Sequence, residues 1–337
     1  MKKTFLMALA ALGFVACMQE QVVTIPQTDA ITFDQAYIDN ATRVTPAADP
    51  STTTQNIAGF DVWAFMNEYD GTVLVDEDVE KAGGSWTYAN TQYWTPNNKY
   101  YFAALAPMNS ANVTETIASG DAAKLGLGEI AFTNVDGSED LLYAATMVQA
   151  PDYDQLKLNN MQPVTFQFSH LLSKVVFKYT NGFTDNNITL NVYDVKINNA
   201  AATGTIPVAG GAAGVWTGTG DYARSFGDAA ADATKALANG ASITTEHFYL
   251  IPVAREYNIT FKVGLYQAGV LLDTYEHDVD ATINIEKGKS YSFNAELTYE
   301  NVNPESQLYP IEFKVDDVDE WDPAAGGNDV DLDIDNI

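Results

Sequence analysis

The chain has 337 residues, with 45 Asp or Glu against 17 Lys or Arg, and a formal net charge of -28. This acidic excess excludes partners that are held through phosphates, so neither a nucleic acid nor an anionic lipid surface is expected. Hydrophobic residues make up 46 % of the chain, which is enough for folded cores, the length suits about two domains, and the single cysteine, Cys17, excludes an internal disulfide.

The N-terminus has the features of an export signal. Lys2 and Lys3 precede an apolar run from Phe5 to Val15, and Cys17 stands where the cleavage site of a secretory signal is expected. This arrangement resembles a bacterial lipoprotein signal, in which residues 1–16 are removed and the new N-terminal Cys17 is acylated, for example with palmitate. The alternative is an ordinary signal peptide with an incidental cysteine.

The first half of the mature chain shows strand patterns. Residues 30–38 carry Ile31, Phe33 and Tyr37 as apolar positions of a half-buried strand, and residues 39–56 form a polar, proline-containing loop. Strand signals return from Phe60, and residues 86–104 are aromatic and β-prone. The aromatic stretch 86–102 is interpreted as core, with a sugar-binding platform as the alternative.

The second half continues in the same way and predicts an all-β protein. The residues from Val164 to Tyr179 form the longest β-prone run, and further short strand patterns follow as far as Leu297. Many short strands with turns between them, and no regular alternation with helices, indicate antiparallel β-sandwiches. The pattern restarts near residue 160, where we place a domain boundary.

The C-terminus alternates apolar and acidic residues. In an extended strand, Val330, Leu332 and Ile334 share one face while aspartates occupy the other, and Ile337 closes the segment. Eight residues span roughly 26 Å, and burying three such side chains contributes about 5–9 kcal/mol before ordering costs. We interpret the segment as a strand that can be donated to a neighbour; the alternatives are an edge strand on its own domain or an acidic tail.

Catalytic and metal-binding patterns are weak. The sequence has no HExxH, GxSxG or Walker A motif, and its three histidines, His170, His247 and His277, have no ligand spacing. We therefore expect a protein that is not an enzyme and has no cofactor or metal site, with His170 as a structural histidine in an apolar strand.

An ordered set of segments resembles the fimbrillin family, the subunits of type V-like pili of Gram-negative gut and oral anaerobes. The segments that carry the resemblance are Trp86-Thr87-Tyr88, Tyr93-Trp94-Thr95-Pro96, Tyr101-Phe102-Ala103-Ala104, Asp140-Leu141-Leu142-Tyr143-Ala144, 164–175, Tyr249-Leu250-Ile251-Pro252 and 287–293. Each segment is weak alone, but together they span most of the mature chain in the right order.

The resemblance implies a fold and an assembly route. The fold is two transthyretin-like antiparallel β-sandwich domains with a C-terminal donor-type strand. Family members travel as lipoproteins to the outer membrane, a trypsin-like protease removes an N-terminal segment, and the subunits polymerise into a surface fimbrium by exchanging a strand. The expected divisions are 1–16 signal peptide, 17–43 leader with the removable strand, 44–160 first sandwich, 161–322 second sandwich, and 323–337 linker and donor strand.

Arg43 is the expected cleavage site. Its nearest basic neighbours are Lys3 and Lys81, so after signal removal a trypsin-like enzyme has one target before residue 81. Cleavage between Arg43 and Val44 would release the strand that carries Ile31, Phe33 and Tyr37. The alternative is a solvated surface arginine.

These observations predict a structural fimbrial subunit that supports adhesion. Its expected partners are other fimbrial subunits, in a homo- or heteropolymer, the processing protease and, through the lipid anchor, the outer membrane. The alternative is a surface lipoprotein or pilus-tip adhesin that binds glycan or host protein.

Overall fold

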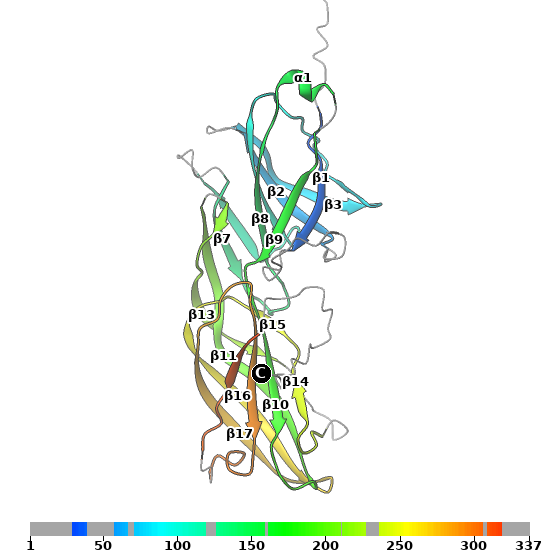
Figure 1. Cartoon of the computed structure of the whole chain (residues 1–337). Helices are drawn as coiled ribbons and strands as arrows, with labels where there is room; N and C mark the ends of the chain where they lie inside the picture. The colour runs from blue at the N-terminus through cyan, green and yellow to red at the C-terminus, as the bar shows by residue number, and fades with distance from the viewer. Residues whose placement is uncertain are drawn as a thin grey trace, which may run out of the picture.

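The described part of the chain is all-β and sandwich-like. A computed structural model describes residues 29–38, 57–66, 71–118, 126–158, 161–209, 211–226, 236–305 and 309–318. Their strands form three sheets along an elongated molecule (Figure 1), and the one helix among these residues, α1 (Tyr153–Leu156), is a single turn. No helix within these ranges is both long and apolar enough to cross a membrane.

The first sheet contains seven strands and begins with the N-terminal strand at one edge. Its strands, in spatial order, are β1 (Phe33–Ile38), β9 (Val164–His170), β8 (Leu142–Gln149), β5 (Lys99–Ala106), β2 (Gly59–Met66), β3 (Gly71–Ala82) and β4 (Ser85–Thr87).

The other two sheets form the larger end of the molecule. The second sheet contains β14 (Ser242–Thr244), β10 (Ser173–Asn181), β18 (Ser290–Leu297) and β19 (Lys314–Val318), with β15 (Phe248–Leu250) also on β10. The third contains β17 (Val270–Ile283), β16 (Arg255–Gln267), β11 (Ile188–Ala209), β7 (Leu127–Thr133) and β6 (Val113–Ile117), with β12 (Ala212–Ala213) and β13 (Thr217–Ser225) on β11.

Three apolar cores join these sheets. One lies between the second and third sheets and includes Phe177 and Phe261. Another lies on the face of the first sheet that β1 covers, and a third joins the opposite face of that sheet to β7 and β11. The sequence of β2, Gly-Phe-Asp-Val-Trp-Ala-Phe-Met, is almost continuously apolar because Phe60 and Trp63 enter different cores.

Two strand pairs differ from the expectation of purely antiparallel sheets. β1 pairs with β9 in parallel, and β10 pairs with β18 in parallel, whereas the other pairings are antiparallel. Parallel neighbours need a long crossover, and more than 100 residues separate the strands of each pair. Short hairpin signals in the sequence therefore carry no information about either pair.

The sheets interleave segments from both sides of residue 160. β9 joins the first sheet, while β6 and β7 join the third. The predicted long strand from Val164 to Tyr179 is divided into β9 and β10, which belong to different sheets, and the buried Leu171 and Leu172 connect them. The domain boundary itself, and the transthyretin-like topology of each half, stay predictions.

Candidate functional site: the segment that closes the first sheet

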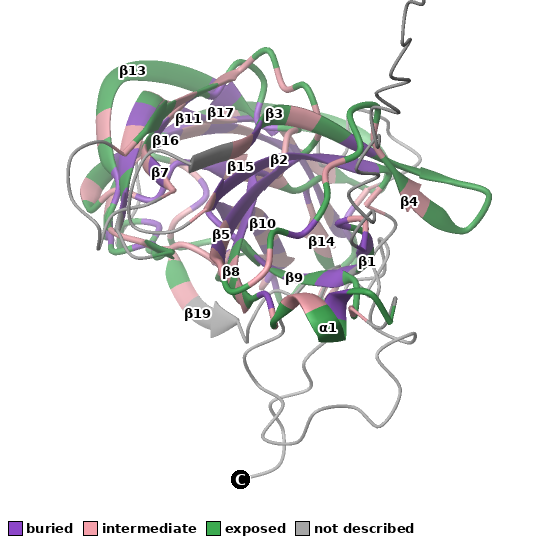
Figure 2. Cartoon of the chain, turned by 90° about the horizontal axis from the view of Figure 1, so that it is seen from above, coloured by how far each residue is buried: buried purple, intermediate pink, exposed green. Residues whose placement is uncertain are grey.

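Residues 29–38 lie between the two ends of the first sheet. β1 is the neighbour of β9 at one end of the strand order, and it also contacts β4 at the other end. Seen from above, β1 stands between β9 and β4 (Figure 2). The segment therefore closes the sheet over an apolar core.

Backbone hydrogen bonds hold the first part of this segment. Ile31 N–H donates to the carbonyl of Gln92 at 2.8 Å, and Trp94 N–H donates to the carbonyl of Asp29 at 3.0 Å. The Tyr88 hydroxyl donates to the carbonyl of Ile31 at 2.9 Å. Residues 29–31 are thus attached to the stretch that follows β4.

The second part of the segment is attached to β9. Val164 N–H donates to the Thr32 carbonyl at 2.7 Å, and the parallel register runs from Phe33 opposite Val164 to Ile38 opposite Phe168. The register shifts between Asp34 and Ala36, so Gln35 is the extra residue of a β-bulge. Beyond Thr32, β1 is paired with one strand only, because it is the edge of the sheet.

Phe33 lies at the centre of an aromatic cluster. Its ring stacks on Phe166 with 5.9 Å between centroids, and it meets Tyr88, Phe60 and Phe102 edge-on at 5.4, 6.0 and 6.3 Å. Full burial of one such apolar side chain stabilises by about 1.5–3 kcal/mol. Ile31, which is completely buried, adds a second anchor of this kind.

Loss of the segment would uncover two kinds of group. The apolar face beneath it includes Phe60, Phe102 and Phe166, and the β9 backbone would lose its ladder partner. An unpaired strand edge beside an apolar groove binds extended segments by β-augmentation. Without the segment, the first sheet would present an edge and a groove of this kind.

The predicted site residues fall into two groups. Ile31 and Phe33 are buried in this segment, and the backbone of Tyr37 lies opposite Gln167. Outside the described residues lie the acylation site, the cleavage site and the donor strand, which are Cys17, Arg43, Val44, Val330, Leu332, Ile334 and Ile337. Sequence reasoning missed Asp29, Tyr88 and Gln92, because only the closed sheet brings them to the segment.

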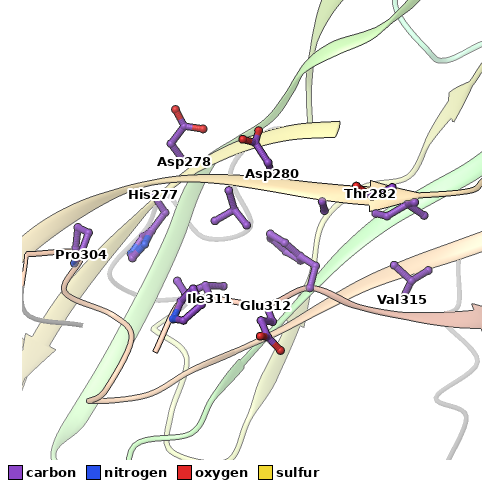
Figure 3. Close-up of a pocket in the computed structure, with 13 residues that line it drawn as sticks. His277, Asp278, Asp280, Thr282, Pro304, Ile311, Glu312 and Val315 are labelled. Carbon is purple, nitrogen blue, oxygen red and sulfur yellow. The ribbon is translucent and has the colours of Figure 1, made fainter. Parts of the chain in front are cut away.

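A second groove lies beside β17 of the third sheet. A cavity of about 500 Å³ separates the C-terminal half of β17 from Pro304 and residues 310–315, with His277, Asp280 and Glu312 among its lining residues (Figure 3). His277 is buried and stacks on Phe261 at 4.9 Å, and burial lowers the pKa of its imidazole to about 4. Burial therefore keeps the His277 imidazole uncharged at neutral pH.

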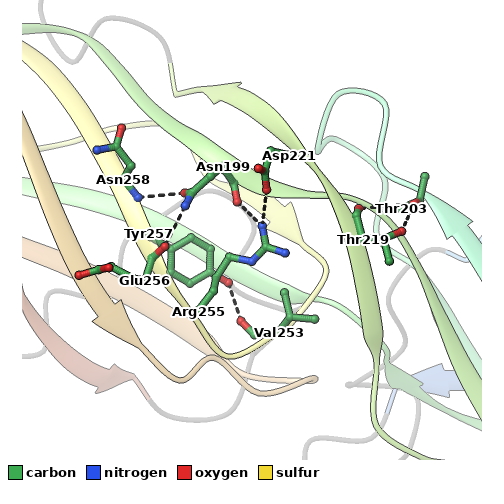
Figure 4. Close-up of polar contacts among 9 residues, drawn as sticks. All are labelled: Asn199, Thr203, Thr219, Asp221, Val253, Arg255, Glu256, Tyr257 and Asn258. Carbon is green, nitrogen blue, oxygen red and sulfur yellow. Dashed lines mark hydrogen bonds and ion pairs between the residues drawn. The ribbon is translucent and has the colours of Figure 1, made fainter.

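A polar network covers part of the third sheet. Arg255 donates to the carboxylate of Asp221 at 3.0 Å, and the Asn199 side chain links to the backbone of Glu256 and Asn258 (Figure 4). Tyr257 directs its ring into the core and donates its hydroxyl to the Val253 carbonyl at 2.9 Å. These contacts join β11, β13 and β16 and are structural.

The remaining candidates for chemistry are also structural. His170 is buried, and its Nδ1 lies 2.8 Å from a carboxylate oxygen of Asp140. Burial raises the pKa of Asp61 to about 6; a hydrogen bond from Asn109 N–H opposes that rise, and the nearby carboxylates of Asp76 and Asp78 add to it. Within the described ranges, no three metal-ligating side chains gather as a possible metal site.

The aromatic stretch 86–102 is largely core, as expected. Trp94, Tyr100 and Phe102 are almost fully buried, and Trp94 contacts Tyr100 edge-on with 4.7 Å between centroids. Tyr93 is 40 % exposed. The buried rings are not accessible to a glycan.

Fold and site together define an all-β protein of the sandwich type, with a groove closed by its own N-terminal strand. A family model described as fimbrillin-like matches residues 42–310, and the chain therefore belongs to the fimbrillin-like family. The resemblance seen in the sequence is confirmed by this match.

Individual relatives are more distant. Fimbrium subunit Fim1C of Phocaeicola vulgatus is 26 % identical over 191 residues, which cover 51 % of this chain and 50 % of Fim1C, so the chain spans about half the length of that curated relative. A solved structure described as a cell adhesion protein of Bacteroides ovatus ATCC 8483 is 17 % identical and covers 88 % of this chain and 98 % of its own, with a TM-score of 0.46. The fimbrial anchor protein Mfa2 of Porphyromonas gingivalis is 10 % identical, with coverage of 87 % and 100 % and a TM-score of 0.39.

Proposed function

We propose that this chain is the lipoprotein precursor of a structural fimbrial subunit, which polymerises by protease-triggered strand exchange and supports adhesion. The precursor is acylated on Cys17 and anchored in the outer membrane, and the clipped subunit joins a cell-surface fimbrium. Membership of the fimbrillin-like family supports this proposal. The observation that carries it is that residues 29–38 close an apolar groove while β1 is paired along one side.

The position of the segment explains why cleavage would act as a trigger. In the intact chain, the covalent link to β2 keeps the segment at a high effective concentration beside its groove, of the order of mM for a short linker. A cut after Arg43 removes that link. The segment then dissociates like a separate peptide, and a donor strand that is tethered in a neighbour competes with it successfully.

Arg43 is also a more suitable target for a trypsin-like enzyme than Lys81. A protease needs several residues of unpaired backbone, which connecting segments offer and sheet strands do not. Lys81, the next basic residue, lies within β3 opposite Trp86 of β4, and its ammonium group stands 5.6 Å from the centroid of the Trp86 ring. Cleavage at Arg43 is therefore expected before cleavage at Lys81.

The test is assembly of the purified chain in solution. A catalytic amount of a trypsin-like protease should convert the mature protein into SDS-resistant multimers with a new N-terminus at Val44, detected by gel electrophoresis and mass spectrometry. Arg43→Gln should leave the protein monomeric under the same treatment. Deletion of residues 328–337 should permit cleavage but prevent multimers.

Two results would count against the proposal. Multimers formed equally well by Arg43→Gln would show that cleavage does not trigger assembly. Clipped protein that keeps residues 29–38 bound and stays monomeric at high concentration would show that the groove does not exchange its strand.

A further inference from the structure

The bulge in β1 gives the groove an unusual spacing. A regular strand buries every second residue, but here the buried apolar side chains among those described in residues 29–38 are Ile31, Phe33 and Ala36, with intervals of two and then three residues. Thr32 and Asp34, which lie between them, are exposed. A strand that replaces β1 without altering its path must carry apolar side chains at the same intervals.

The C-terminal segment of the chain has these intervals. Its apolar residues Leu332, Ile334 and Ile337 are also separated by two and then three positions. The residues around them correspond as well: residues 31–36 read Ile-Thr-Phe-Asp-Gln-Ala, and residues 332–337 read Leu-Asp-Ile-Asp-Asn-Ile. Both segments place an aspartate and then an amide residue before the last apolar position.

We propose that the groove accepts the C-terminal segment of a second copy of this chain in the bulged register of β1. Leu332 then takes the place of Ile31, Ile334 that of Phe33 and Ile337 that of Ala36. This inference rests on the proposed function, and it adds the partner and the register. The subunit is then self-complementary and forms a homopolymer.

Packing supports this register. Leu332 is close in volume to Ile31, Ile334 is smaller than Phe33, and Ile337 is larger than Ala36. Phe33 and Ala36 are neighbours on one face, and both meet Phe166, the first by ring stacking and the second as its register partner. The smaller volume of Ile334 is therefore offset by the larger volume of Ile337 beside the same ring. Cores tolerate compensating volume changes of this kind.

Charge supports it too. In the bulged register Asp333 and Asp335 take the exposed places of Thr32 and Asp34. The outward-facing residues of β9 are Thr165, Gln167 and Ser169, which are all uncharged. The two aspartates of the donor therefore face solvent and meet no carboxylate on the neighbouring strand.

A regular register is the main competitor. It would place Leu332 opposite Val164 and Ile334 opposite Phe166, with Val330 two residues earlier. Asn336 would then point into the apolar groove near Phe168, and an amide buried without partners is unfavourable by about 1–3 kcal/mol. In the bulged register Asn336 is not placed opposite Phe168, because it becomes the extra residue without a register partner, as Gln35 is in β1.

Engineered cysteines distinguish the registers. Thr165 is exposed and stands opposite Asp34, so the bulged register brings Asp335 of the donor to it, while the regular register brings Asp333. Cys17 leaves with the clipped leader, so the introduced thiols are the only ones in the subunit. In clipped protein that carries Thr165→Cys, intersubunit disulfides should form at least tenfold faster when Asp335→Cys supplies the donor thiol than when Asp333→Cys supplies it. Asp331→Cys is the background control.

Two substitutions that add the same charge provide a second test. Ile337→Asp places a carboxylate against Phe166 in the bulged register and should reduce multimer yield at least tenfold. Asn336→Asp adds the same charge at the extra residue of the bulge, which has no register partner in β9, and should change the yield less than twofold. The regular register predicts the opposite order.

The outcomes separate this inference from the proposed function. Multimers that crosslink through Asp333→Cys, or that tolerate Ile337→Asp but not Asn336→Asp, overturn the register and leave strand exchange standing. If the clipped single protein forms multimers only after a different subunit is added, the homopolymer is wrong. If no multimer forms under any condition, the proposed function fails.

Discussion

The two parallel strand pairs of this molecule are held in very different ways. β18 pairs with β10 through eight consecutive positions without a register shift, and it pairs on its other side with β19. β1 pairs with β9 through five positions interrupted by a bulge, and it forms the edge of its sheet. Both carry a buried phenylalanine, Phe293 in β18 and Phe33 in β1.

The difference indicates which strand requires less free energy to release. Removal of β18 would divide the second sheet and open the core between the second and third sheets, so its release amounts to global unfolding. Removal of β1 leaves the remaining six strands of the first sheet connected. Local opening of an edge segment requires less free energy than global unfolding. The following predictions test this contrast, beginning with the largest effect.

Truncation of a buried phenylalanine should lower the stability of the whole fold when it is made in β18, and only the stability of the sheet edge when it is made in β1. Phe293→Ala and Phe33→Ala each remove a buried ring, which is expected to be unfavourable by about 3–5 kcal/mol. For Phe293→Ala the loss should appear in the free energy of global unfolding. For Phe33→Ala it should appear as faster native-state hydrogen exchange of Val164 N–H, with the β10 amides unchanged. Equal loss of protection in both sheets for both variants would show that the regions open together.

His277, which stacks on Phe261 in the core between the second and third sheets, should make the protein less stable in acid. Its folded-state pKa of about 4 lies below the ordinary 6.5, so the folded protein binds fewer protons than the unfolded chain between these values. Stability therefore falls as the pH drops from about 6.5 to 4, by on the order of 2 kcal/mol. His277→Gln should remove this part of the pH dependence, as measured by urea unfolding at each pH.

Asp61, which lies on β2 of the first sheet, should have the opposite effect on the pH dependence of stability. Its folded-state pKa of about 6 lies above 3.8, so the folded protein binds more protons between these values. This carboxyl group therefore destabilises the fold as the pH rises through 6, by on the order of 1–2 kcal/mol. Asp61→Asn should be more stable than the parent at pH 7 and equally stable at pH 4. A variant that is less stable at pH 7 would contradict this.

Two tyrosine hydroxyls offer the smallest comparison. Tyr88 donates to the Ile31 carbonyl and Tyr257 to the Val253 carbonyl, both at 2.9 Å, and the Tyr88 hydroxyl also accepts from Gln92 N–H at 2.9 Å. Loss of one such hydrogen bond is unfavourable by about 1 kcal/mol. Tyr88→Phe should speed multimer formation after clipping, because residues 29–38 are held less firmly. Tyr257→Phe should lower global stability by about 1 kcal/mol without changing the assembly rate.

The structure agrees with the sequence where the pattern is local. Period-two alternation identified the strand around Phe33 and those in the second half of the chain, because alternate side chains of a strand face opposite sides wherever it lies. The absence of helical periodicity predicted an all-β fold. The buried Trp94, Tyr100 and Phe102 also follow from local aromatic content.

The pairing of the strands required the tertiary structure. Nothing local indicates that β1 lies parallel to β9, more than 120 residues away, or that Gln35 becomes an extra residue. Nor does the sequence pattern show that the run from Val164 to Tyr179 is divided between two sheets. Residues such as Gln92 and Tyr88 entered the site only through the closure of the sheet.

The sequence by itself determined which segments are extended and which of their faces are apolar, because these properties depend on neighbours a few residues away. The tertiary structure decided which strand lies at an edge, and therefore which one the proposed exchange would release. That choice depends on contacts between segments that are far apart in the chain, so the sequence of any one segment does not determine it.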